Sequence, residues 1–197
     1  PLGAVQAAAP AGFVEYRIGF DAATSDRRAP TEMDLRLPRR EREMIERVAR
    51  AWGLPGLEPA SAAEALRARF AADFRYSTFQ EMSASGRTPL ADFLERTRAG
   101  HCEHFATATT LLLRAAGIPA RYASGYSVQE WSDIERAWIA RERHSHAWTR
   151  AWVGGRWIDV DTTPSSWFDL EGGARPAWTF LADAWSWLRF RLDRGYR

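Results

Sequence analysis

The chain has 197 residues, of which 46% are hydrophobic, so it can bury one full core and we expect one globular domain with tails. Its 27 basic residues, all of them arginine, nearly balance 25 acidic ones and are scattered among them, which argues against a nucleic-acid partner. One cysteine cannot form an internal disulfide, and the chain has no apolar run long enough to span a bilayer, so we expect a soluble piece of a longer protein.

The first part of the chain is predicted to be an arm followed by two scaffold helices. Residues 1–36 are rich in alanine, proline, glycine and arginine and are expected to be extended. Apolar residues at helical spacing then predict helices over Arg39–Trp52 and Ala62–Asp73. Ser61, with Glu64 three residues later, is a capping-box signature for the start of the second helix.

The only cysteine, Cys102, lies where the next long helix is predicted to begin. Apolar residues recur at helical spacing over Phe105–Ala116, with Gly100 before them and Gly117 after them as boundaries. In the first turn of a helix, unpaired N–H groups and the positive end of the dipole stabilise a thiolate and lower the pKa of the thiol. A lone cysteine is more often a small buried hydrophobic residue, so its role depends on its partners.

A strand and a charged excursion follow the cysteine helix. Ala120–Val128 reads as a strand, and Gly125 inside it indicates a bulge or a close approach of backbone to a ligand. Glu130–Arg143 is charged and carries two tryptophans, so we expect a surface loop beside whatever is bound.

Two further strands have a clear connection. Gly154-Gly155 between His146–Val153 and Arg156–Pro164 predicts a hairpin with a two-residue turn. That turn sets a register in which Trp152 faces Trp157, Arg150 faces Asp159, Trp148 faces Asp161 and His146 faces Thr163. Side chains alternate between faces, so one face of the hairpin carries the histidine, the aromatic residues and both aspartates. We expect this aromatic face to pack against the cysteine helix.

The register makes His146 and Asp161 diagonal neighbours, about 7–8 Å apart before their side chains reach toward each other. A nucleophilic thiol needs a base, and the base needs a group that fixes its tautomer. Cys102, His146 and Asp161 supply these three parts. Trp148 is expected to shield the bond between the histidine and the aspartate, or simply to be a core residue.

Two close alternatives within this set are less favoured. His144 shares a strand face with His146 by parity, but only His146 is diagonal to Asp161. Asp159 shares a face with Asp161, but it lies opposite Arg150 and is more simply an ion pair.

Three motifs occur in order along the chain. They are Gly-His-Cys-Glu-His-Phe-Ala at 100–106 with Arg-Ala-Ala-Gly-Ile-Pro-Ala-Arg at 114–121 and Gly125-Tyr126, then His146-Ala147-Trp148, then Trp157 with Asp-Thr-Thr-Pro at 161–164. On these motifs the chain resembles the bacterial transglutaminase-like superfamily, and within it the soluble periplasmic domain of membrane-anchored, TgpA-type members. The resemblance covers Leu37 to Pro164.

The resemblance implies an α+β, papain-like fold, in which N-terminal helices and a catalytic cysteine at a helix start pack on an antiparallel sheet. It maps the catalytic triad onto Cys102, His146 and Asp161. It also implies three segments, with an arm at 1–36, a catalytic core at 37–168 and a helical tail at 169–197. Thr162 stands where a proline is usual, which we expect to alter a strand end and leave the triad intact.

The implied activity is that of a transglutaminase-like cysteine acyltransferase acting on glutamine or other amide groups of a protein or peptide, without a cofactor. Cys102 attacks the amide carbonyl, and the thioester passes to an amine or, in a peptidase or amidase, to water. The backbone N–H of Cys102 is expected in the oxyanion hole, with Tyr76 as a candidate second donor. Tyr126 and Trp148 are further candidates for contact with substrate.

Two other classes of function stay open. His101, Cys102, His104, His144 and His146 include all the histidines and the cysteine, and such clustering occurs in zinc sites. Adjacent and helix-spaced positions make it difficult for all five to reach one ion, so we expect no metal. An inactive binding module with the same fold is the other alternative.

The end of the chain predicts a membrane connection. Trp178, Leu181, Trp185, Leu188 and Leu192 form an apolar helical stripe, followed by arginines. Tryptophan and arginine together are typical of a membrane interface, and the resembling proteins continue into a transmembrane helix here. We expect attachment to a membrane, with the domain on its periplasmic, extracytoplasmic side; the alternative is that the stripe docks on the domain.

Overall fold

A computed structural model describes residues 28–79, 86–128, 130–132, 136–140 and 144–167, together with Trp185, Leu188 and Leu192. Residues 24–173 form one compact unit, which holds all described positions except those three. The predicted tail at 169–197 otherwise lies outside the described residues. In the part of the chain that is described, no helix is long and apolar enough to cross a bilayer.

The described residues form helices and short sheets. The helices are η1 (Glu32–Leu35), α1 (Arg42–Ala51), α2 (Pro59–Asp73), α3 (Pro89–Asp92), the π-helical turn η2 (Phe93–Thr97) and α4 (Cys102–Ala115). The strands are β1 (Arg75–Tyr76), β2 (Ala99–Gly100), β3 (Ala120–Tyr126), β4 (Glu130–Ser132), β5 (Ala137–Ile139), β6 (Ser145–Val153) and β7 (Arg156–Val160). This content confirms the predicted α+β class.

Both scaffold helices are present, with shifted starts. The second one, α2, begins at Pro59, two residues before the predicted cap. Proline suits the first turn of a helix because its fixed φ is already helical and its missing N–H would have no intrahelical partner there. The helix therefore begins before Ser61, with Glu58 at the N-cap position, and the predicted capping box at Ser61 and Glu64 is wrong.

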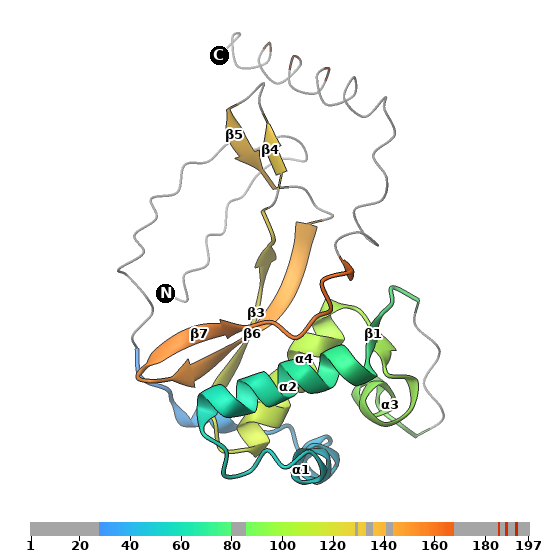
Figure 1. Ribbon diagram of the computed structural model, residues 1–197, viewed down its shortest axis with the longest axis vertical. Coiled ribbons are helices and arrows are strands. Elements are labelled where there is room, and N and C mark those ends of the chain that lie inside the picture. The colour runs from blue at the N-terminus through green and yellow to red at the C-terminus, as the bar shows by residue number, and fades with distance from the viewer. Residues whose placement is uncertain are drawn as a thin grey trace. The chain divides into compact units, whose positions relative to one another are not determined.

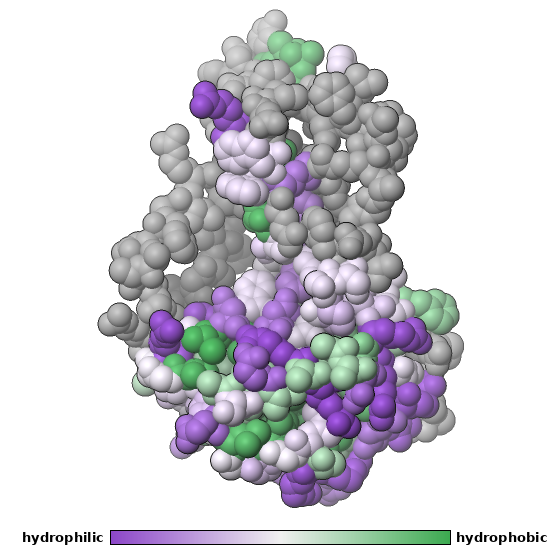
Figure 2. All heavy atoms as spheres, in the orientation of Figure 1, coloured by the Kyte–Doolittle hydropathy of each residue, from purple (hydrophilic) through white to green (hydrophobic). Residues whose placement is uncertain are grey.

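On the exposed side of α2, Arg69 pairs with Asp73 at 2.7 Å. Hydrophilic and hydrophobic side chains are intermixed on the face of the molecule that Figure 2 shows.

Strands β3, β6 and β7 form an antiparallel sheet in the order β3-β6-β7. The β6–β7 turn is Gly154-Gly155, and both residues have positive φ, +58° and +79°, which glycine adopts without steric cost. The pairs are Val153 with Arg156, Trp152 with Trp157, Ala151 with Ile158, Arg150 with Asp159 and Thr149 with Val160. The predicted register is confirmed over these pairs. Because β7 ends at Val160, Asp161 lies just beyond the ladder, and the predicted pairing of Trp148 with Asp161 is not formed.

Helix α4 packs on the small-residue face of β6, beside α1 and α2 (Figure 1). Ala147, Thr149 and Ala151 are buried on this face, and the Thr149 hydroxyl donates to the carbonyl of Ala106 at 2.9 Å. The prediction that the aromatic face meets the cysteine helix is therefore wrong. The face with small side chains packs on α4 because it lets the helix approach closely enough for a hydrogen bond between a side chain and the backbone.

Two short pairs of strands lie outside the main sheet, one of them in the segment predicted as a surface loop. Within the predicted surface loop Glu130–Arg143, β4 and β5 pair antiparallel, with Trp131 opposite Trp138. Tyr76, the candidate second oxyanion donor, lies in β1, which pairs in parallel with β2.

The described end of the predicted arm packs on the sheet. Asp34 in η1 is buried and accepts two hydrogen bonds from the Arg121 guanidinium on β3, at 2.8 and 3.0 Å. The same guanidinium lies 3.9 Å from the centre of the Trp157 ring, a cation–π contact. The Trp157 indole N–H donates to the carbonyl of Arg28 at 2.9 Å. Residues 28–36 are thus held against β3 and β7 rather than extended away.

The helices meet in a cluster of four phenylalanines from α2, η2, α4 and the residue after α2. Ring centroids lie 4.8 Å apart for Phe70 and Phe74, 5.4 Å for Phe70 and Phe105, and 5.0 Å for Phe93 and Phe105. Phe70 and Phe105 are both fully buried. This cluster fixes α4, and with it Cys102, relative to the scaffold helices.

The cluster predicts a large stability loss on truncation. Phe70→Ala should lower the free energy of unfolding by about 3–5 kcal/mol, because it removes a buried ring and leaves a cavity. Urea unfolding followed by circular dichroism measures this change. Phe79, which is 77% exposed, supplies the control: Phe79→Ala should be close to neutral, and equal losses in the two variants would contradict the assigned core.

Candidate active site

Cys102 is the first residue of α4, as predicted from the boundary glycines. His101 before it is extended, with φ −94° and ψ 177°, and serves as the N-cap. The thiol is therefore buried at the end of the helix where backbone N–H groups are free of intrahelical partners. The fit at Gly100 is close, because a Cβ there would lie 2.9 Å from the Cγ of His104.

The thiol is strongly perturbed toward its ionised form. Burial alone would raise the pKa of Cys102, but the side chains of His101 and His146 and the backbone N–H of Ala147 outweigh it and lower the pKa from 9.0 to about 7. A thiolate is the nucleophilic form of cysteine. A substantial fraction of Cys102 is thus reactive near neutral pH.

His146, on β6, is tied to Asp161 just after β7. Its Nε2 lies 2.7 Å from Oδ2 of Asp161, and Oδ1 of the same carboxylate accepts from the backbone N–H of Thr163 at 2.9 Å. Because an ionised carboxylate only accepts hydrogen bonds, this contact fixes the imidazole proton on Nε2. The other nitrogen, Nδ1, is buried and forms no hydrogen bond with the described residues.

The charges of the three groups stabilise one another. Burial alone would lower the pKa of His146, but Asp161 and then Cys102 raise it from 6.5 to about 9. Burial alone would raise the pKa of Asp161, but His146 and the N–H of Thr163 hold it below 3.8. As pH rises, the thiol ionises first and the imidazolium loses its proton later. Between these two pKa values the site holds a thiolate beside an imidazolium.

Two tryptophans stack on the His146 ring, and sequence reasoning named only one. Trp167 lies at 4.3 Å between centroids and 9° between planes, and Trp148 at 6.2 Å and 15°. Trp148 donates its indole N–H to Asp159 at 3.1 Å, and its predicted pairing with Asp161 is not part of the β6–β7 ladder. Trp167 is buried and is placed by a turn in which its N–H donates to the carbonyl of Pro164 at 3.0 Å. The sequence signal that could have indicated Trp167 is its position, as a large aromatic residue just after the motif at 161–164.

The Trp148 ring lies close to the backbone of Gly125. A Cβ at this residue would lie 3.1 Å from Cη2 of the Trp148 ring. The predicted bulge is absent, because β3 pairs with β6 residue by residue through Gly125. The group that lies close to Gly125 in the structure is a side chain of the neighbouring strand.

The tyrosines of the region lie on different elements. Tyr76 is buried in the core and pairs with Gly100, two residues before the cysteine. Tyr126 is 56% exposed at the end of β3. Tyr122, on the same exposed face of β3, was not predicted as a site residue: burial and the charges of Glu103 and Cys102 raise its pKa above 10.0. Alternation along β3 from Tyr126 would have found it.

The less favoured residues lie elsewhere. His144 is buried, with Nε2 at 3.9 Å from Glu130. Asp159 is exposed and accepts from the Arg150 side chain at 3.1 Å. Among the described residues, no group of three histidine, cysteine or acidic side chains is arranged to hold a metal ion.

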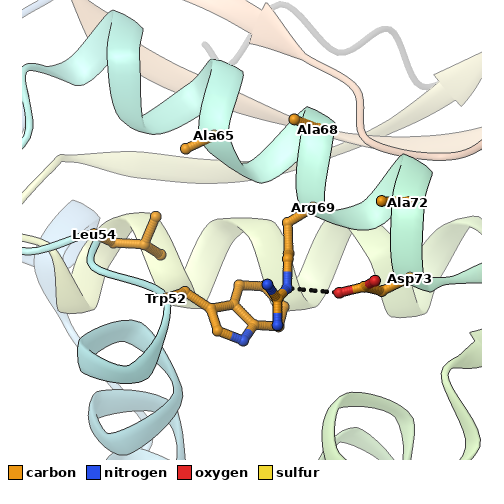
Figure 3. A pocket seen from close by; sticks show the side chains of 7 residues that line it. All are labelled: Trp52, Leu54, Ala65, Ala68, Arg69, Ala72 and Asp73. Atoms are coloured by element: carbon orange, nitrogen blue, oxygen red, sulfur yellow. Dashed lines mark ion pairs between the residues drawn. The ribbon is translucent and has the colours of Figure 1, made fainter.

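A groove lined by α2 and by the residues just after α1 is a separate feature of the surface (Figure 3). Its lining consists of Trp52, Leu54, Ala65, Ala68, Arg69, Ala72 and Asp73. The Arg69 guanidinium lies over the Trp52 ring at 5.4 Å. None of Cys102, His146 and Asp161 lines this groove, so the candidate active site is the surface around the thiol.

Comparison with known proteins identifies related sequences. A model of the transglutaminase-like superfamily matches residues 48–162. Protein-glutamine gamma-glutamyltransferase of Pseudomonas aeruginosa is 40% identical over 81 residues, which are 41% of this chain and 12% of that protein. An uncharacterised protein of Mycobacterium leprae is 42% identical over 66 residues, 34% of this chain and 23% of that protein. The chain thus spans less than a quarter of the length of these two relatives.

Solved structures give the same relationship. The periplasmic domain of TgpA from Pseudomonas aeruginosa, bound to ethylmercury, superposes with a TM-score of 0.60 at 29% identity, covering 71% of this chain and 49% of that one. A second structure of that domain has a TM-score of 0.54 at 29% identity and covers 70% and 47%.

The geometry predicts how thiol reactivity depends on pH. Alkylation of Cys102 by iodoacetamide should increase with pH around a midpoint of about 7. Asp161→Asn should move this midpoint to higher pH, because the imidazolium that stabilises the thiolate loses its carboxylate. Asp159→Asn is the control and should leave it unchanged; equal shifts in both variants would contradict the assigned partner of His146.

Proposed function

The chain belongs to the transglutaminase-like superfamily, and on that basis we propose that it is a cysteine acyltransferase in which Cys102 is the nucleophile, His146 the base and Asp161 the orienting carboxylate. The family match and the likeness to a solved domain confirm the predicted α+β, papain-like core. The proposed substrates are glutamine side chains or other amides of a protein or peptide, as the name of the Pseudomonas aeruginosa relative suggests.

The observation that carries this proposal is that the two imidazole nitrogens of His146 have different surroundings. Nε2 is hydrogen-bonded to Asp161, whereas Nδ1 is buried and has no hydrogen-bond partner among the described residues. Cys102 and His146 each shift the pKa of the other, so they lie within electrostatic reach. Nδ1 is then the nitrogen that takes the thiol proton.

Acylation follows from this arrangement. The Cys102 sulfur forms a bond to the amide carbonyl carbon, and the carbonyl electron pair moves onto oxygen. When the tetrahedral intermediate collapses, the C–N bond breaks and the imidazolium of His146 gives its proton to the leaving nitrogen. Ammonia or an amine departs, and a thioester remains on the cysteine.

Deacylation runs through the same groups. An incoming amine loses a proton to Nδ1 of His146 as it attacks the thioester, and the thiolate leaves, so a new amide forms. Water attacking in place of the amine would give a carboxylic acid. The choice between these products depends on how well the surface near the thiol holds an amine.

Other residues are proposed for supporting roles. The N–H of Cys102 at the start of α4 is the proposed donor to the oxyanion, favoured by the positive end of the helix. Tyr76 remains the proposed second donor, since β1 places it opposite Gly100. Tyr126 and Tyr122, exposed on β3, and Trp148, beside His146, are proposed to contact substrate.

The complete protein is proposed to be attached to a membrane, with this domain on the periplasmic side. The support is the related domain of Pseudomonas aeruginosa, which is periplasmic, and the stripe of tryptophan and leucine followed by arginine near the end of the chain.

Activity is tested with a glutamine-containing peptide and a fluorescent primary amine, scoring amine incorporation and ammonia release separately. Cys102→Ala should abolish both. His146→Ala should lower kcat/KM by roughly 10³-fold or more, because the thiol loses its base. His144→Ala should cost far less. Turnover that survives in Cys102→Ala, or a larger loss for His144 than for His146, would refute the assignment.

Location is tested on the full-length protein in its host. It should fractionate with membranes, and protease added to spheroplasts should cleave the domain. A domain that stays protected until the cells are lysed would place it in the cytoplasm.

A further inference from the structure

The segment that carries Asp161 is joined to the helix that carries Cys102 by a buried hydrogen bond between two threonines. Oγ1 of Thr109 on α4 lies 2.7 Å from Oγ1 of Thr162, the residue directly after Asp161. Their exposed fractions are 0% and 7%. A buried hydroxyl that loses its partner keeps the cost of its desolvation without a hydrogen bond to offset it, so each side chain strongly favours the other's position.

Asp161 itself is poorly fixed by packing. Its side chain is 43% exposed, and it lies beyond the last residue pair of the β6–β7 ladder. The backbone on either side is held instead, by Val160, which is fully buried at the end of β7, and by Thr162. The direction of the carboxylate therefore depends on these two flanking anchors and on the backbone N–H of Thr163, the residue after the second anchor, which donates to Oδ1 at 2.9 Å.

The second of these anchors, Thr162, is bonded to the helix that carries Cys102. Thr109 is seven residues after Cys102, about two helical turns, so both lie on the same side of α4. The threonine bond thus connects this side of the helix to the residue that follows the carboxylate. Cys102, His146 and Asp161 form a series of contacts, and the threonine bond connects the helix at its first residue to the segment at its last.

We propose that Thr109 and Thr162 are positioning residues, whose hydrogen bond holds Asp161 in the orientation that serves His146. This inference rests on the proposed function for its kinetic consequence, but not for its structural one. Loss of the bond releases one flank of Asp161, weakens its contact with Nε2 and so destabilises the imidazolium that faces the thiolate.

The molecule offers a matched internal control. On the same helix, Thr110 forms a buried hydrogen bond with Thr149 at 3.0 Å, and Thr149 also donates to the carbonyl of Ala106. This pair has the same chemistry and joins α4 to the sheet, but Thr149 lies in the middle of β6. Thr110→Val should lower stability about as much as Thr109→Val without affecting Asp161.

The experiment compares Thr162→Val, Thr109→Val, the double variant and Thr110→Val by three measurements: melting temperature, pH midpoint of Cys102 alkylation, and kcat with KM. Both site variants should raise the alkylation midpoint and lower kcat by about 10- to 100-fold at nearly unchanged KM, the size expected when a catalytic group is slightly misplaced. The double variant should be no worse than the worse single one, because the two changes remove one interaction. Thr110→Val should lower only the melting temperature.

Thr162→Ser is the rescue, because it keeps the hydroxyl and should restore the midpoint and kcat even if Thr162→Val folds poorly. The proposal is overturned if the site variants change stability alone, as Thr110→Val does, if their effects on kcat add, or if serine fails to rescue. Absence of turnover in the unmodified protein would refute the proposed function and leave the alkylation comparison to decide this inference by itself.

Discussion

The contact between α4 and the small-residue face of β6 is the constraint on which the rest of the structure depends. Ala147 and Thr149 leave room for the helix, and the Thr149 hydroxyl bonds the carbonyl of Ala106. That close approach brings the thiol at the start of α4 beside the strand that supplies His146. A larger side chain on this face would push the helix outward and separate the two groups, because packed interiors respond even to one added methylene.

The charge state of the site belongs to three residues together. Burial favours the neutral forms of Cys102, His146 and Asp161 when each is considered alone. Their mutual contacts, together with His101 and the N–H of Ala147 at the thiol and the N–H of Thr163 at the carboxylate, reverse all three preferences, so the thiolate, the imidazolium and the carboxylate stabilise one another. A change at any one of them alters the protonation of the others, and their titrations describe the group as a whole.

Sequence patterns predicted some parts of this site and missed others for physical reasons. The two-glycine turn and the alternation of strand residues determine a register, so the diagonal relation of His146 to Asp161 followed directly. The face of β6 that packs on α4 could not be predicted in this way. The hydrophobic pattern favours the face with the tryptophans, whereas close approach of a helix needs small residues such as alanine and threonine. Trp167 follows the last strand through a turn, where no periodicity indicates which way a side chain points. The bond from Thr109 to Thr162 joins residues 53 apart, a separation that local patterns do not reach.

Arginine supplies the cations of the ion pairs that brace this fold, as in Arg121 with Asp34 and Arg87 with Asp92, and the 197 residues contain no lysine. A guanidinium keeps its proton at any physiological pH and its electrons are delocalised, so it does not attack a thioester as a free amine does. An acyl group held on Cys102 therefore meets no lysine side chain within these 197 residues. Within this stretch of chain the proposed chemistry cannot cross-link the catalyst to itself through lysine, and a lysine acceptor has to come from outside these 197 residues.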